Sequence, residues 1–147
     1  MRAHAGEAMT ILDTNVVSEL MLPIPSPAVL SWVSAQPLDA FHATTITLAE
    51  ILYGIEILPQ GKRRSALLAG AERMFSKVLA GRILPFEEEA AHAFSRIAAG
   101  RRAQGRPMAE FDAQISAIAY VHGAVLATRN TADFEGCGIR LANPWVD

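Results

Sequence analysis

Short apolar runs alternate with longer segments of helical periodicity along almost the whole chain, and this alternation restricts the fold more than any other feature. A strand–helix–strand unit favours a right-handed crossover, which makes the two strands parallel. The sequence therefore predicts an α/β domain of three layers, in which helices flank a mainly parallel central sheet. Strands are expected at residues 10–12, 41–44, 82–85, 124–128 and 139–141. Helices are expected at residues 15–22, 28–35, 47–58, 62–80, 87–104 and 111–122, with a short turn or helix at 130–134.

The composition is that of a globular chain. Of the 147 residues, 51% are hydrophobic and 19% are charged, which excludes an intrinsically disordered protein. No apolar stretch approaches the roughly 18 residues of a membrane span, and a single cysteine, Cys137, excludes an internal disulfide framework. We therefore expect a cytoplasmic protein.

The two ends of the folded part can also be predicted. The first eight residues lack the apolar stretch of a secretion signal, and the first strand begins at Thr10. We predict a disordered extension over residues 1–8 and a folded domain over residues 9–147, with Met9 as the natural start.

Four acidic residues, Asp13, Glu50, Asp112 and Asp133, lie where an apolar run gives way to a helix or turn. In parallel sheets the functional crevice lies beyond the carboxyl ends of the strands. Segments far apart in the sequence can therefore bring these four carboxylates to one edge of the sheet.

Each acid also has a local explanation. Asp13 is a suitable helix cap, and Thr47 with Glu50 fits a capping box. Asp112 suits the positive end of a helix dipole, and Asp133 suits an Asx turn. Taken singly, the local and the functional explanations carry equal weight, but the local ones do not require the four acids to converge.

Converging carboxylates favour a divalent cation. Two of them about 4 Å apart repel by roughly 4 kcal/mol at an effective dielectric constant near 20. Hard oxygen ligands, without paired histidines or cysteines, select Mg²⁺ or Mn²⁺ over zinc. Such an ion can hold a phosphodiester oxygen and lower the pKa of a bound water. Because the formal net charge is -2, a nucleic acid must be held by such a metal or by local basic groups.

Several motifs, taken in order, resemble the PIN-domain family, and within it the VapC and FitB branch of type II toxins. The resemblance covers essentially all of residues 9–147 and rests on residues 11–15, 46–54, 81–86, 112–119, 127–134 and 143–145. It implies a PIN-like fold and a Mg²⁺-dependent ribonuclease, with Mn²⁺ as a substitute. It also implies a homodimer and a small VapB- or FitA-like antitoxin, which binds the toxin's groove and often DNA.

The resemblance assigns roles to the acids. Asp13 and Asp112 are expected to be the principal metal ligands, and Glu50 to position the ion or the attacking hydroxide, directly or through water. At the fourth position some relatives carry an acid where this chain has Asn130, and Asp133 supplies the charge three residues later. Both stay candidates, with Asp133 ahead because of its charge. The alternative function is a catalytically weak PIN module that acts mainly as a binding or regulatory partner in an antitoxin–DNA complex.

The basic residues are less informative. Residues 62–64, Arg101, Arg102 and Arg106 are consistent with RNA contacts, but a solvated helix face is favoured. Arg129 lies next to the proposed site and is a better candidate for a phosphate contact.

Overall fold

The computed structural model describes residues 9–147, and the predicted extension over residues 1–8 lies outside them. A five-stranded sheet of order β3-β2-β1-β4-β5 forms the centre, and every neighbouring pair of strands is parallel. The predicted α/β fold with a mainly parallel sheet is therefore confirmed. The strands are β1 (Thr10–Leu12), β2 (Phe41–Thr44), β3 (Ile83–Leu84), β4 (Val125–Ala127) and β5 (Arg140–Ala142).

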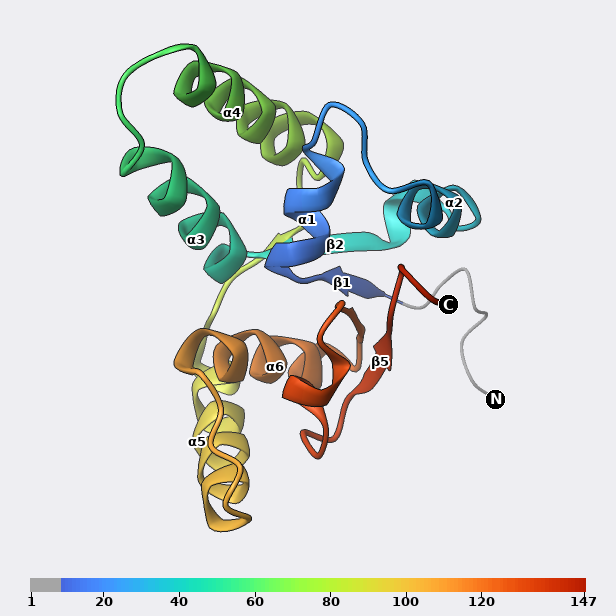
Figure 1. Ribbon diagram of the computed structural model, residues 1–147. Coiled ribbons are helices and arrows are strands. Elements are labelled where there is room, and N and C mark those ends of the chain that lie inside the picture. The colour runs from blue at the N-terminus through green and yellow to red at the C-terminus, as the bar shows by residue number, and fades with distance from the viewer. Residues whose placement is uncertain (1–8) are drawn as a thin grey trace.

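Helices cover both faces of the sheet, which gives three layers (Figure 1). Helices α1 to α4 pack on one face, and α5 and α6 pack on the other. None of the helices in residues 9–147 has the length and apolarity that crossing a membrane requires. The helices are α1 (Thr14–Leu20), α2 (Pro27–Ser34), α3 (Thr45–Glu56), α4 (Lys62–Arg73), α5 (Glu88–Ala103) and α6 (Glu110–His122). Shorter segments are η2 (Leu38–Ala40), η3 (Met74–Val78) and η4 (Thr131–Phe134).

The central strand β1 contributes to two separate cores. Ile11 packs with Ile118 and Leu126 below the sheet, whereas Leu12 packs with Phe41 above it. Successive side chains of a strand point to opposite faces, and both faces here are covered. This is why the strands read as continuous apolar runs rather than as an alternation of apolar and polar residues.

The predicted helix over residues 62–80 is only partly correct. The α-helix ends at Arg73, and a π-helical turn, η3, follows. The backbone N–H of Leu79 donates to the carbonyl oxygen of Met74 at 2.8 Å, and both side chains are buried. The wider turn brings two residues five positions apart toward the same core, which an α-helix does not do. Apolar periodicity alone does not predict such a turn.

Candidate active site

The candidate site lies at the carboxyl edge of the sheet, where the chain turns from β1, β2 and β4 into the segments that follow. The strand order changes direction at β1, because β2 and β3 lie on one side of it and β4 and β5 on the other. The backbone N–H of Asp13 donates to the carbonyl oxygen of Ala127 at 3.0 Å, so the ends of β1 and β4 are joined directly. In open α/β sheets this is the position where ligands bind.

Asp13 caps α1 and also faces the site. Its Oδ1 accepts the backbone N–H of Val16 at 3.0 Å, which confirms the capping role. The residue is only 4% exposed, and this burial raises the pKa of its carboxyl. Hydrogen bonds from Thr128 and from the backbone lower that pKa, while the negative charge of Glu50 raises it further. Asp13 is therefore a buried carboxyl close to a second acid.

The capping-box explanation of Glu50 is wrong. Thr44, at the end of β2, is the N-cap of α3, and its hydroxyl accepts the backbone N–H of Thr47 at 3.1 Å. Glu50 consequently lies in the second turn, beyond reach of the cap. The Thr14 hydroxyl donates to Oε1 of Glu50 at 2.7 Å and lies 3.1 Å from the Thr47 hydroxyl. A residue from α1 thus holds the carboxylate of α3.

Asp112 links the four acids electrostatically. It is half-buried in the first turn of α6. Burial is the largest cause of a rise in its pKa to about 6, and the negative charges of Asp133, Glu50 and Asp13 raise it further. All three other acids therefore act on this carboxyl, so the structure brings the four together as the positions of the acids predicted.

The segment after β4 contains the two candidates for the fourth site residue, Asn130 and Asp133. Asp133 lies in η4 with an exposed side chain, and its charge acts on Asp112 more strongly than that of Glu50 or Asp13. The backbone N–H of Asn130 donates to the Thr128 hydroxyl at 3.0 Å, and its side chain is exposed. Of the three other acids, Asp133 therefore raises the pKa of Asp112 most, and Asn130 lies at the turn that leads to Asp133.

The donor set suits a hard divalent cation, although the acids do not form a closed cage. Within residues 9–147, no three His, Cys, Asp or Glu side chains are arranged so that they could hold a metal ion. Mg²⁺ does not require such a cage, because it is usually bound by one or two carboxylates, several waters and substrate phosphates. Asp13 is a buried carboxyl and Asp112 a half-buried one, and within the described chain no neighbouring cation lowers the pKa of either. These carboxylates fit such an ion.

Two further polar residues lie beside the acids but are not among the predicted site residues. Thr47 is fully buried and contacts Thr14. Ser116 is fully buried one turn after Asp112, and its hydroxyl has no hydrogen-bond partner within the described chain. Both residues share a helical face with an acid, Thr47 with Glu50 and Ser116 with Asp112. That spacing is the signal by which they could have been found.

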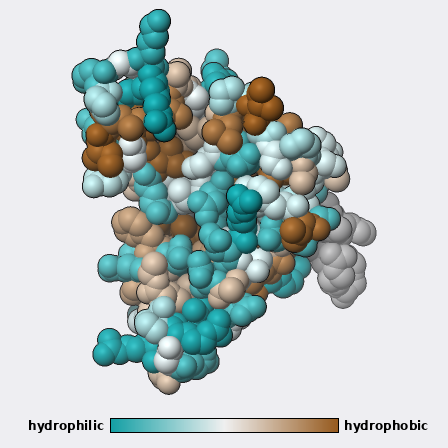
Figure 2. Space-filling model, viewed as in Figure 1, coloured by the Kyte–Doolittle hydropathy of each residue, from teal (hydrophilic) through white to brown (hydrophobic). Residues whose placement is uncertain are grey.

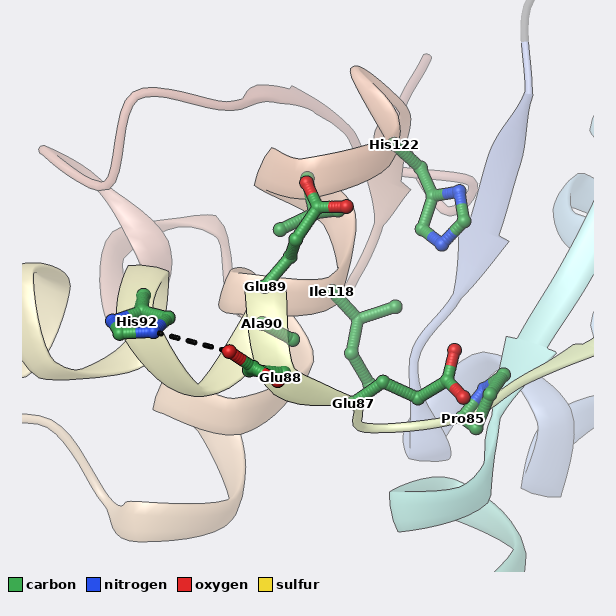
Figure 3. A pocket seen from close by; sticks show the side chains of 9 residues that line it. Pro85, Glu87, Glu88, Glu89, Ala90, His92, Ile118 and His122 are labelled. Atoms are coloured by element: carbon green, nitrogen blue, oxygen red, sulfur yellow. Dashed lines mark ion pairs between the residues drawn. The ribbon is translucent and has the colours of Figure 1, made fainter.

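A separate hollow of about 390 Å³ lies between the start of α5 and the end of α6 (Figure 3). Its lining includes Glu88 and His92, which form an exposed ion pair at 3.9 Å, and His122. None of the four acids lines it. Glu88 and Glu89 are surface charges in the first turn of α5, at the positive end of the helix.

Comparisons with known proteins agree with this geometry. Residues 10–136 match the family model of the PIN domain. The chain is 39% identical over 137 residues to VapC ribonuclease Y4jK of Sinorhizobium fredii. The aligned region covers 93% of this chain and 98% of the relative. It is also 35% identical over 139 residues to toxin FitB of Neisseria gonorrhoeae. That aligned region covers 95% of this chain and 100% of the toxin.

A solved structure extends the likeness to three dimensions. A chain in the structure of FitAB bound to a DNA fragment superposes with a TM-score of 0.85 at 35% identity, over 93% of this chain and 96% of that one. Matches of sequence and structure therefore span the strands, helices and acids described above. The chain belongs to the PIN domain family.

Proposed function

We propose that this protein is the toxin of a type II toxin–antitoxin module and a ribonuclease that hydrolyses RNA phosphodiester bonds. The observation that carries the proposal is the meeting of Asp13, Glu50, Asp112 and Asp133 at one edge of the sheet. The same chain is 39% identical to a VapC ribonuclease along nearly its full length. We further propose that the nuclease domain spans residues 9–147 and that the protein acts in the cytoplasm.

VapC ribonucleases with a PIN domain generally depend on a divalent metal, and for this chain we propose Mg²⁺, with Mn²⁺ as a substitute. Asp13 and Asp112 would be the principal ligands, and Glu50 and Asp133 would assist. When bound, the ion would stabilise negative charge on the phosphodiester and activate a water. Hard carboxylate oxygens and the absence of paired His or Cys in the set support this choice.

The chain's own residues have distinct tasks in this proposal. Thr14 holds Glu50 by the 2.7 Å hydrogen bond, so that Glu50 can orient the attacking water. Asn130 would use its side-chain carbonyl to ligate or to hold a second water. The exposed guanidinium of Arg129 lies 4.8 Å from the centre of the Trp145 ring, next to the end of β4. This cation is placed to contact an RNA phosphate.

An antitoxin of the VapB or FitA kind would bind a groove next to the acids. This groove of about 340 Å³ is lined by Thr14 and Glu50 and by apolar residues of α3, of α4 and of the segment that follows α1. Figure 2 shows hydrophobic side chains gathered over α3 and the loop between α1 and α2. Exposed apolar residues there are Leu22, Ile24, Leu52, Tyr53 and Ile57.

An apolar groove that runs into an acidic site suits an amphipathic helix followed by a basic residue. DNA would be bound only through the antitoxin, and the toxin is proposed to be a homodimer. Size-exclusion chromatography with light scattering measures both assemblies.

Cleavage of RNA by purified variants tests the function. Wild-type protein should cleave total tRNA only when Mg²⁺ or Mn²⁺ is present, and Asp13→Asn and Asp112→Asn should each be inactive. Asp39→Asn is a matched control, because this exposed acid lies in η2 before β2, at the opposite edge of the sheet. Equal residual activity in all four proteins would identify a contaminating nuclease. Antitoxin binding without any cleavage would favour the regulatory module instead.

A further inference from the structure

Arg101 is a buried cation, contrary to the expectation of a solvated or RNA-binding residue. It lies in the last turn of α5 and is only 5% exposed, whereas the neighbouring Arg102 is exposed. Within residues 9–147 it forms no ion pair. Removing a guanidinium from water costs several kcal/mol unless its donors are satisfied. The contacts of this side chain therefore need an explanation.

The Arg101 side chain donates to three backbone carbonyls from two different segments. Its Nε donates to the carbonyl oxygen of Arg106 at 2.8 Å. Its Nη1 donates to the carbonyl oxygens of Asp133 at 3.0 Å and Glu135 at 2.9 Å. The planar fork of arginine suits this task, because its donors point in fixed and different directions.

The two segments held by Arg101 are the ones that carry two of the acids. Arg106 lies in the loop that leads into α6 and therefore to Asp112. Asp133 and Glu135 lie in η4 and just after it, and Arg101 contacts the backbone of Asp133 itself. Neither segment is joined to the other by a strand ladder at this point, since β4 ends at Ala127 and β5 begins at Arg140.

We propose that Arg101 is a positioning residue that fixes the distance between Asp112 and the Asp133 segment. It does so by fastening the loop before α6 and the turn after β4 to the end of α5. This inference rests on the proposed nuclease function, because it matters only if the two acids act together. Since the side chain is buried and engaged with carbonyls, it does not contact RNA.

A second arginine spans the same two segments but less firmly. Nη2 of Arg106 lies 3.3 Å from the carbonyl oxygen of Ala132 and 3.4 Å from Oε1 of Glu135, and the residue is exposed. Exposed contacts of this length contribute little. Arg101 is therefore the principal connection.

Arg101→Lys is the decisive variant. An ammonium keeps the charge, but its three donors share one nitrogen and cannot reproduce the separate positions of Nε and Nη1, which reach two segments. At a temperature where circular dichroism shows the variant to be folded, we expect kcat to fall about 10-fold and the affinity for Mn²⁺ to weaken by a similar factor, as for residues that orient metal ligands. KM for the RNA oligonucleotide that wild-type protein cleaves fastest should change less than about two-fold, because RNA is not touched. Arg102→Lys, on the same helix and exposed, is the matched control and should match wild type.

The outcomes separate the two proposals. Wild-type kcat and Mn²⁺ affinity in folded Arg101→Lys would overturn the positioning role and leave a purely stabilising residue. A raised KM with unchanged kcat would also overturn it, because that result indicates an RNA contact. If wild-type protein itself neither binds Mn²⁺ nor cleaves RNA, the proposed function fails and not the positioning role alone.

A measurement on wild-type protein covers the case in which Arg101→Lys does not fold. The Nε–H of Arg101 is buried and hydrogen-bonded, so its nitrogen-15 NMR signal is expected to be resolved. Addition of Mg²⁺ should shift this signal, because the ion pulls on both segments that the side chain holds. The Nε–H signal of Arg102 should not move. An unchanged Arg101 signal in protein saturated with Mg²⁺ would contradict the proposal.

Discussion

At the level of single residues, local structure and site chemistry use the same groups. Asp13 caps α1 through Val16 and is also the buried carboxyl that faces Glu50. Thr14, the first residue of that helix, donates its hydroxyl to Glu50 on α3. A residue that fits a capping pattern is therefore not excluded from a site. The cap fixes its backbone, which helps to hold the carboxylate in place.

The hydroxyl of Thr14 provides a first prediction. Thr14→Val keeps the shape of the side chain but removes the 2.7 Å hydrogen bond to Glu50. A hydrogen bond to a charged group contributes about 1.5 kcal/mol or more, which corresponds to roughly a 10-fold loss of kcat. Thr14→Ser retains the donor and should stay within about two-fold of wild type. Steady-state cleavage of an RNA oligonucleotide measures both, and equal activity of the two variants would remove Thr14 from the site.

Asp112 provides a second prediction, on stability without metal. Its pKa is raised to about 6 in the folded protein, from an ordinary value of 3.8. The folded state therefore holds the proton more tightly than the unfolded state, so this group's contribution to stability is lost as pH rises through about 6. Asp112→Asn removes the charge. We expect it to raise the free energy of unfolding by about 1 kcal/mol at about pH 7.5. This is less than the full pKa shift corresponds to, because solvent screens a half-exposed carboxyl.

Urea denaturation in EDTA at several pH values measures this difference. The gap between Asp112→Asn and wild type should close as pH falls toward the ordinary pKa of 3.8. A variant that is less stable than wild type at neutral pH would show that Asp112 forms favourable contacts in the absence of metal. That result would contradict the expectation that repulsion among the four carboxylates destabilises the metal-free fold.

At the level of elements, the sequence predicted the order and type of the strands and helices well but their ends less well. Gly123, just after the predicted end of α6, adopts a left-handed conformation with φ of 60°. Helix α3 begins at Thr45, earlier than the predicted residue 47, because Thr44 rather than Thr47 is its cap. Composition patterns also could not reveal η3 or the burial of Arg101, since both depend on contacts between segments far apart in the chain.

Two glycines allow a comparison between a left-handed helix end and a helix interior. Gly123→Ala should destabilise the protein by about 1 kcal/mol, because a Cβ is unfavourable at positive φ. Gly100→Ala lies inside α5 and should stabilise it by about 0.5–1 kcal/mol. A Cβ at either position meets no atom within 4 Å, so the contrast isolates the backbone. Thermal unfolding of both variants checks the opposite signs, and a loss of stability in both would contradict the explanation.

At the level of the whole molecule, negative charge is concentrated at the site rather than spread over the chain. The formal net charge is only -2, yet the charges of Asp133, Glu50 and Asp13 all act on Asp112 at one edge of the sheet. Burial of Asp13 and Asp112 makes this arrangement costly in the folded protein without a cation. A cation that binds the folded state relieves the repulsion and stabilises the fold as a whole.

Stabilisation by a divalent cation should therefore depend on pH. At a Mg²⁺ concentration about ten times the dissociation constant, binding adds about 1.4 kcal/mol to the free energy of unfolding, and Tm should rise by about 5 °C. Protons compete with the cation for Asp112, so the rise should shrink as pH falls below about 6. Differential scanning fluorimetry with Mg²⁺ and Mn²⁺ at several pH values measures this rise in Tm. The variants Asp13→Asn and Asp112→Asn should not show the rise. A rise that is equally large at acid pH, or that persists in both variants, would place the cation elsewhere on the molecule.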